Sequence, residues 1–332
     1  MVLGGNRSIF GVASDGREVY TVRLATERIE VEILTFGAII RDIVFDGRST
    51  VLGCDTLRDY ETRSPYFGAI VGRCANRIAR GRLELDGETH QLTLNENGRH
   101  HLHGGAPGFS RRNWSLVDHD ARSVTLRLVS EDGDQGYPGR VEATCRYALV
   151  GPAEVEFALE ATTDRPTVVN LANHTYFNLT GEDVVDDHTV RIAAARHLPV
   201  DDELIPTGAI DPVEGTRFDF RQPRRIGAER YDTPFVLDGG KTPHPRPVAT
   251  VLGVNGVRLD IATTQPNIQF YTGQQTAPGT PGRDGRRYGP GAGLCLETQG
   301  FPDAPNHPNF PSIALLPGET YRQVTRFAFS EA

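Results

Sequence analysis

The chain has 332 residues, of which 38% are hydrophobic and 23% charged, so it can bury a core and is not globally disordered. Its net charge of −8 argues against a nucleic-acid partner, which normally shows as a basic domain or stripe. No apolar run approaches the roughly 18 residues of a membrane span, so no membrane partner is expected.

The four cysteines favour a reducing compartment. Cys54, Cys74, Cys145 and Cys295 are scattered, and no pair has the C-x-x-C spacing of a structural zinc site. In a chain of this length they do not form a disulfide framework, so reduced thiols are expected. The N-terminal region lacks the basic and apolar stretches of a signal peptide, which favours a cytoplasmic location.

The strand pattern begins near residue 28 and continues almost to the C-terminal end. Alternating polar and apolar residues predict strands over 28–34, 38–45, 82–85, 89–94, 123–129, 141–150, 155–162, 248–252, 257–261, 313–316 and 321–329. Short turns join several of them into hairpins, at Asp86-Gly87, Gly151-Pro152, Asn255-Gly256 and Pro317-Gly318.

These elements predict an all-β protein. No segment has the periodicity of a helix of four turns, and the nearest candidate, 70–83, is interrupted by Gly72 and Gly81. Strands that recur about every ten to fifteen residues predict one large antiparallel β-sandwich with few short helices. The Gly-rich stretch 279–293 is interpreted as a long loop between two strands, so we expect a single domain over 1–332.

Four polar clusters interrupt the strand pattern and are the candidates for function. They are 72–79 (GRCANRIA), 100–105 (HHLHGG), 170–178 (NLANHTYFN) and 294–303 (LCLETQGFPD). Glu297 lies in an apolar alternation, where partial burial would raise its pKa toward that of a general base. His174 lies in a strand-like stretch and can exchange a proton near neutral pH. A strand-end Glu paired with an Arg and a core His with satisfied hydrogen bonds are the structural alternatives.

The same residues leave other chemistries open. His101 and His103 have an H-x-H spacing that would place two imidazoles on one strand face, and with His174 and Glu297 they could hold a metal, as in a cupin-like barrel. No stronger ligand motif supports this site, so no metal is expected. Asp232 and Glu297 could form the carboxylate pair of a glycoside hydrolase. The glycine motifs that bind phosphates or dinucleotides are lacking.

Several segments can be compared with a known family as an ordered set. They are 65–68 (PYFG), 72–78 (GRxANRI), 83–87 (LxLDG), 102–105 (LHGG), 173–179 (NHTYFNL), 269–273 (QFYTG), 297–303 (ETQxxPD), Asn306 and 310–312 (FPS). In this order the chain resembles the aldose 1-epimerase (galactose mutarotase) family over roughly residues 20 to 327. Any single segment would be weak, whereas the ordered set is specific.

The resemblance implies a galactose mutarotase-like supersandwich with an open sugar-binding cleft and no cofactor. It implies that Glu297 is the catalytic base and His174 the catalytic acid. The side chains that it implies for sugar binding are those of Asn76, Arg77, His103, Asp232 and Gln269.

Two positions depart from the family pattern. Asp232-Thr233-Pro234-Phe235 stands where the family often has Asp-His-Asn-Phe or Asp-His-Pro-Phe, so the second position lacks its His. His101 stands where a small polar residue is common. We interpret His101 as part of the cleft wall or of the layer behind it, with a bystander position on the surface as the alternative.

The predicted function is interconversion of the α and β anomers of a free hexose such as galactose or glucose. Ring opening needs a base at the C1 hydroxyl and an acid at the ring oxygen, and the two exchange roles on closure. The alternatives are a non-catalytic sugar-binding module and a hexose 6-phosphate 1-epimerase on the same fold. The phosphate-binding candidates for the second alternative are Arg111-Arg112 and Arg224-Arg225. The expected partner is a small aldose, and the sequence predicts nothing about protein partners.

Overall fold

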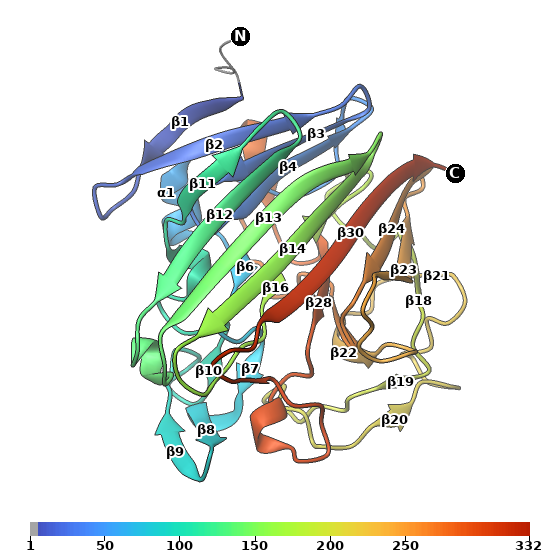
Figure 1. The fold of residues 1–332 in the computed structure, drawn as a ribbon. Helices are drawn as coiled ribbons and strands as arrows, with labels where there is room; N and C mark the ends of the chain where they lie inside the picture. Colours follow the sequence, from blue (N-terminus) through green and yellow to red (C-terminus); the bar gives the residue numbers. More distant parts are fainter. Residues whose placement is uncertain (1–5) are drawn as a thin grey trace.

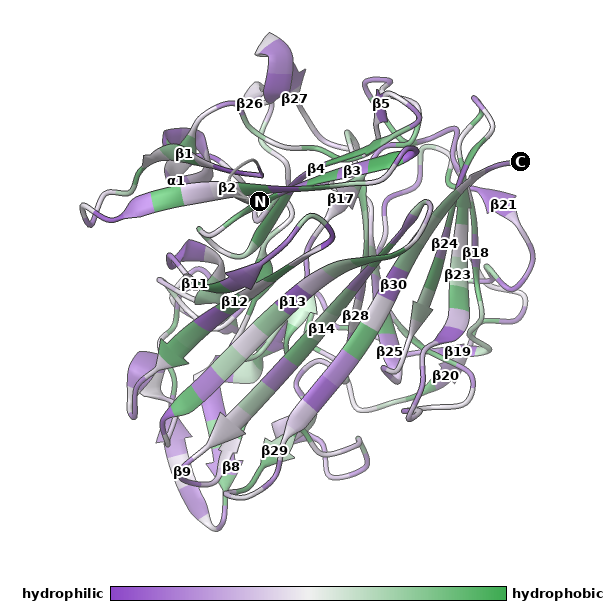
Figure 2. Cartoon of the chain, turned by 45° about the horizontal axis from the view of Figure 1, so that its top comes forward, coloured by the Kyte–Doolittle hydropathy of each residue, from purple (hydrophilic) through white to green (hydrophobic). Residues whose placement is uncertain are grey.

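The largest unit of the computed structural model, which describes residues 6–332, is an antiparallel sheet of nine strands (Figure 1). In spatial order its strands are β11 (Ser115–His119), β12 (Ser123–Ser130), β13 (Val141–Gly151), β14 (Glu154–Thr163), β30 (Tyr321–Glu331), β24 (Val257–Thr263), β23 (Arg246–Leu252), β18 (Thr189–Ile192) and β21 (Arg224–Arg225). Hydrophobic and hydrophilic residues alternate along β13, β14 and β30 (Figure 2). One face of this sheet is therefore apolar and packs on the core.

A second sheet, of six strands, covers that apolar face. Its spatial order is β17 (Tyr176–Phe177), β28 (Leu294–Gln299), β25 (Asn267–Tyr271), β22 (Asp232–Val236), β19 (Arg196–His197) and β20 (Asp211–Pro212). Leu294 and Leu296 of β28 and Phe270 of β25 join Leu159 and Phe327 of the large sheet in one hydrophobic cluster. The predicted antiparallel β-sandwich is thereby confirmed.

A third sheet of five strands lies over one end of the sandwich (Figure 1). Its strands are β1 (Arg7–Val12), β2 (Glu18–Ala25), β3 (Ile29–Leu34), β4 (Ile39–Phe45) and β5 (Arg48–Ser49). Five two-stranded pairs complete the strands: β6 (Ile70–Val71) with β16 (Ala172–Asn173), β7 (Arg77–Ile78) with β10 (His101–Leu102), β8 (Arg82–Leu85) with β9 (Glu88–Gln91), β15 (Thr167–Val168) with β29 (Ala314–Leu315), and β26 (Thr280–Pro281) with β27 (Arg287–Tyr288).

Helices are few and short, as the sequence predicts. In residues 6–332 the only α-helix is α1 (Leu57–Thr62), which begins where the Thr56 side chain accepts a hydrogen bond from the backbone N–H of Asp59. Single 3₁₀ turns occur at Ala79–Gly81, Phe109–Arg111, Asp134–Gly136, Arg283–Gly285 and Ala304–Asn306. Among the described helices, none is long and apolar enough to cross a membrane.

One predicted hairpin is wrong. The turn at Pro317-Gly318 forms, with Glu319 N–H donating to the Leu316 carbonyl (3.0 Å), but the segments on either side of it do not pair. β29 pairs with β15, whereas β30 lies between β14 and β24. The long alternation of β30 can bury its apolar face only inside the large sheet, and that requirement outweighs the local turn signal. The stretch 279–293, expected as a loop, contains the short β26–β27 pair.

Candidate functional site

The predicted polar clusters meet in a narrow cleft on the outer face of the six-stranded sheet. Its walls come from the turn before β7, the segments next to β10, β16 and β17, and the strands β22, β25 and β28. The residues that line it are Pro65, Tyr66, Asn76, Arg77, Leu102, His103, His174, Tyr176, Asp232, Tyr271, Gln275 and Glu297. Sequence-distant segments are thus brought together around one small space.

Glu297 enters this cleft because of the two-residue period of β28. Leu294 and Leu296 point into the sandwich core, so Cys295 and Glu297 point to the opposite face. Glu297 is only 2% exposed, and in the described chain its Oε2 has no hydrogen-bond partner. Burial raises the pKa of Glu297 well above its ordinary value, and the charge of Asp232 raises it further.

His174 faces Glu297 from the loop between β16 and β17. Its Nε2 lies 3.6 Å from Oε1 of Glu297, and its Nδ1 lies 3.4 Å from Sγ of Cys295. The imidazole is stacked between the rings of Tyr66 and Tyr176, with centroid distances of 5.6 and 5.0 Å. Burial lowers the pKa of His174 to about 3. The ring is therefore held in one orientation, in a site that disfavours an isolated imidazolium.

His103 stands beside His174, with ring centroids 5.2 Å apart. Its backbone has a positive φ of 50°, which turns the side chain out of β10 and into the cleft. The backbone N–H of Asn76 donates to Nδ1 of His103 (3.1 Å). A neutral His103 therefore carries its proton on Nε2, where it can be donated to a ligand. Burial lowers the pKa of His103 well below its ordinary value, which keeps the ring neutral.

Arg77 is held in place by Glu96. Its Nε donates to both carboxylate oxygens (3.1 and 3.0 Å) and its Nη2 donates to Oε1 (2.8 Å). The remaining nitrogen, Nη1, lies 4.0 Å from Oδ2 of Asp232 across the cleft. Glu96 therefore occupies the edge of the guanidinium that carries Nε and Nη2, and Nη1 is left to face the cleft.

Asp232 is held by Gln269, whose Nε2 donates to Oδ1 (2.6 Å). Burial raises the pKa of Asp232, whereas Arg77 and the hydrogen bond from Gln269 oppose that shift. The family resemblance implies that Gln269 binds the sugar, but Gln269 is not among the lining residues. It lies on β25, next to Asp232 of the neighbouring strand β22. Gln269 is thus placed to orient the Asp232 carboxylate. The glutamine that lines the cleft is Gln275.

The four candidate metal ligands do not all converge. Donor atoms of His103, His174 and Glu297 lie within 4.8 Å of one another. His101 is fully buried elsewhere, bonded to the Thr93 carbonyl (2.7 Å) and to the hydroxyl of Tyr137 (2.8 Å). His101 is thus neither among the residues that line the cleft nor exposed on the surface. It does not share a strand face with His103, because β10 ends at Leu102 and His103 has a positive φ.

The arginine pairs considered for phosphate binding lie outside the cleft. Arg111 donates to the backbone carbonyls around α1, and Arg112 pairs with Asp134. Arg224 donates to the backbone carbonyl of Arg217, and Arg225 pairs with an acidic residue before β18. These four guanidiniums are therefore engaged by the protein itself and do not form a phosphate site next to Glu297 and His174.

Some residues of the site are not identified by the sequence-based prediction, among them two lining tyrosines and the partner of Arg77. Tyr66 and Tyr271 belong to segments that match the family, but nothing in a strand pattern separates a cleft tyrosine from a core tyrosine. Glu96, which holds Arg77, lies in a Gly-containing turn without a motif. Only the tertiary fold brings Glu96 to the guanidinium.

Comparisons with known proteins match one family over nearly the whole chain. A family model described as aldose 1-epimerase matches residues 20–328. The chain is 41% identical to galactose mutarotase from Rattus norvegicus, over 98% of each chain. It is 37% identical to aldose 1-epimerase from Escherichia coli K12, over 96% of this chain and 97% of that protein.

Solved structures agree with the sequence matches. An aldose epimerase homologue from C. elegans superposes with a TM-score of 0.88 at 31% identity, covering 94% of this chain and 99% of that chain. A galactose 1-epimerase from Lactobacillus acidophilus superposes with a TM-score of 0.87 at 29% identity, covering all of both chains.

Proposed function

The chain belongs to the aldose 1-epimerase family and is a mutarotase, an isomerase, and we propose that Glu297 and His174 carry its proton transfers. The substrate we propose is a free hexose such as galactose or glucose. The observation that carries this proposal is the distance of 3.6 Å between Nε2 of His174 and Oε1 of Glu297. In a cyclic aldose, the C1 hydroxyl and the ring oxygen are bonded to the same carbon. A base and an acid this close together can therefore reach both oxygens at once.

The proton transfers balance within this pair. Glu297 takes the proton of the C1 hydroxyl while Nε2 of His174 gives its proton to the ring oxygen, so the bond between C1 and the ring oxygen breaks. The products are the open-chain aldehyde, a protonated Glu297 and a neutral His174. After rotation about the C1–C2 bond, His174 takes back the proton from the hydroxyl and Glu297 protonates the carbonyl oxygen. The ring closes as either anomer and the pair returns to its starting state.

Burial favours the forward step of this cycle. The pKa of Glu297 is raised and that of His174 is lowered, so the interior favours the neutral pair over the ion pair. The neutral pair is the state that accompanies the open-chain sugar. Since the two groups face each other, their single proton belongs to the pair rather than to either residue. Throughout the cycle Nδ1 of His174 can keep its own proton toward Sγ of Cys295, a weak acceptor.

Binding of the sugar is assigned to the remaining cleft residues. Arg77 and Asp232 offer a donor and an acceptor that face each other in the cleft, and His103 offers its Nε2–H beside His174. Asn76 also lines the cleft, from a turn at φ 60°. Such fixed partners hold the ring atoms in place during rotation about C1–C2.

A polarimetric assay tests this function against its two alternatives. The purified protein should accelerate mutarotation of α-galactose and α-glucose, whereas a binding module would bind either sugar without changing the rate. Addition of galactose 6-phosphate and glucose 6-phosphate to the panel tests the phosphate alternative. Rates confined to the phosphorylated sugars would contradict the proposed substrate class.

We also propose one domain over 1–332 and a cytoplasmic location. The largest hydrophobic cluster draws on residues from Val22 to Phe329, which supports one continuous core. The cysteines of the described chain are buried and unpaired, as expected in a reducing compartment.

A further inference from the structure

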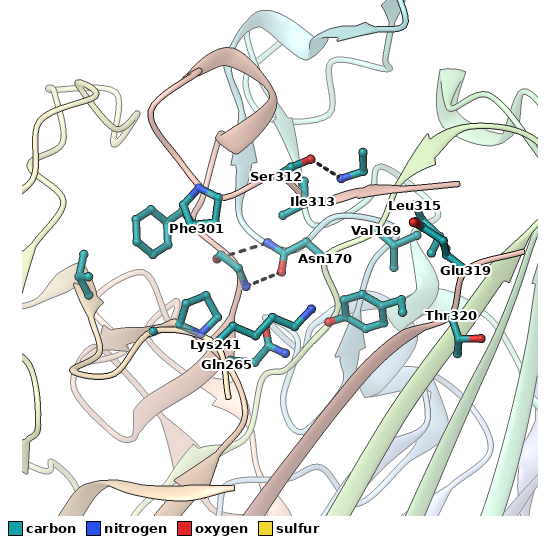
Figure 3. Close-up of a pocket in the computed structure, with 17 residues that line it drawn as sticks. Val169, Asn170, Lys241, Gln265, Phe301, Ser312, Ile313, Leu315, Glu319 and Thr320 are labelled. Atoms are coloured by element: carbon teal, nitrogen blue, oxygen red, sulfur yellow. Dashed lines mark hydrogen bonds between the residues drawn. The ribbon is translucent and has the colours of Figure 1, made fainter. Parts of the chain in front are cut away.

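A larger cavity lies away from the catalytic cleft and shares none of its lining residues (Figure 3). Its volume of about 550 Å³ falls within the range of small-molecule sites, which is roughly 300–1,000 Å³. The side chains of Val169, Val236, Phe301, Ile313 and Leu315 supply most of its apolar wall. Most sites of this size combine such walls with a few polar groups that orient a ligand.

The polar groups at one side of this cavity are donors without an acidic partner. Lys241, the only lysine of the chain, lines the cavity and within residues 6–332 makes no ion pair. Gln265 lies beside it, is 2% exposed and has a buried Nε2 without a hydrogen-bond partner. Arg246, which does not line the cavity, donates to the Gln265 carbonyl (3.2 Å).

The one carboxylate of the lining belongs to Glu319, on the opposite side of the cavity in Figure 3. Its Oε2 accepts a hydrogen bond from the backbone N–H of Leu316 (3.1 Å), so it is engaged at the rim. On the side of Gln265 the charged group that lines the cavity is therefore the cation Lys241. A buried amide without a partner costs free energy unless a ligand satisfies it.

We propose that this cavity is a second binding site, for a small organic carboxylate with an apolar body. The carboxylate would accept hydrogen bonds from Lys241 and Gln265, and the apolar body would lie against Phe301, Ile313 and Leu315. Charge-assisted bonds to such an anion are stronger than those to a neutral group of the same shape. A free sugar would leave several hydroxyl groups against these apolar side chains, which cannot satisfy them.

Calorimetric titration of the whole protein with phenylacetate and with phenylacetamide tests the charge requirement. The two probes have the same ring and nearly the same shape, but only the first is an anion. Phenylacetate should bind about tenfold or more tightly than phenylacetamide, the ratio expected for a hydrogen bond to a charged group. Equal affinities, or no binding of phenylacetate at millimolar concentration, would overturn the proposal.

Two variants locate the site. Lys241→Gln should remove the preference for phenylacetate while leaving mutarotation unchanged, and Ala314→Trp should fill the cavity and weaken both probes. Arg48→Gln, which removes an exposed cation on β5, is the matched control and should bind phenylacetate as the wild type does. Saturating galactose should not displace the probe. If galactose displaced it, or if Lys241→Gln kept the wild-type preference, the carboxylate would bind elsewhere.

Discussion

Glu96 accepts hydrogen bonds from Nε and Nη2 of Arg77, and it leaves Nη1 of the guanidinium directed across the cleft toward Asp232. The side chain of Arg77 is 6% exposed and that of Glu96 17%, so the pair is shielded from solvent. A charge pair in such surroundings is rigid, and loss of one partner leaves the other charge uncompensated. Glu96 thus orients Arg77 from the side of the guanidinium away from Asp232.

Glu96→Gln should weaken sugar binding more than it slows the chemical step. The amide keeps one acceptor but loses the charge, so Arg77 would lose its fixed orientation. We expect KM for galactose to rise by about tenfold, with a much smaller change in kcat. Steady-state mutarotation kinetics measure both constants. Glu88→Gln, at an exposed position of β9, is the control, and an equal rise in KM for both variants would rule out the positioning role.

Glu297→Gln should nearly abolish mutarotation while the protein still binds sugar. The amide is of similar size but cannot take the proton of the C1 hydroxyl. Loss of a general base typically lowers the rate by about 10²–10⁴-fold. Polarimetry measures the rate, and calorimetry with galactose measures binding. A variant that kept half of the wild-type rate would show that Glu297 is not the base.

His174→Asn and Arg77→Lys should show opposite kinetic patterns. Asn can accept or donate a hydrogen bond but cannot deliver a proton, so kcat should fall by about 10²-fold or more while KM changes little. Lys replaces a fork-shaped donor by a point charge, so KM should rise more than kcat falls. Both variants are measured with galactose at several pH values. If His174→Asn raised only KM, the acid would have to be sought at His103.

Activity should not depend on a metal, although His103, His174 and Glu297 offer three donor atoms within 4.8 Å. In the proposed cycle Glu297 and His174 exchange protons directly with the sugar, and an ion bound to their donor atoms would block that exchange. Prolonged dialysis against a chelator, followed by assay and elemental analysis, measures the dependence. Activity that was lost together with a stoichiometric metal and restored by adding it back would favour a metal centre.

Acidification should destabilise the fold, because several histidines are buried in the neutral form. Burial lowers the pKa of His101 and of His188 from 6.5 to about 4. Between pH 6.5 and about 4 the unfolded chain therefore binds protons that the folded chain does not. The free energy of unfolding must fall as the pH falls through this window.

Urea unfolding at pH 7 and pH 5 measures this loss. The midpoint should be lower at pH 5, and His188→Gln should reduce the difference between the two midpoints. Gln can still accept the hydrogen bond that the backbone N–H of Leu179 donates to His188 (3.0 Å), so the variant tests charge rather than packing. A midpoint that was unchanged or higher at pH 5 would contradict the assignment of neutral buried histidines.

Local pattern was enough for much of the fold. The hairpin of β13 and β14 follows from strict alternation on both sides of Gly151-Pro152, because a period of two can bury only one face of a strand. The same argument failed at Pro317-Gly318, where the turn is correct but the pairing is not. A turn signal is local, whereas the partner of β30 is chosen by the area buried in the large sheet.

The sequence by itself determined many of the long strands, the family resemblance and the identity of Glu297 and His174 as the candidate pair. Their residue types and the ordered motifs around them carry that information along the chain. Only the tertiary structure decided that these side chains lie 3.6 Å apart, that Glu96 holds Arg77, and that His101 is directed elsewhere. Contacts between distant segments depend on how sheets pack and how single residues such as His103 turn the backbone, and a linear pattern does not specify either.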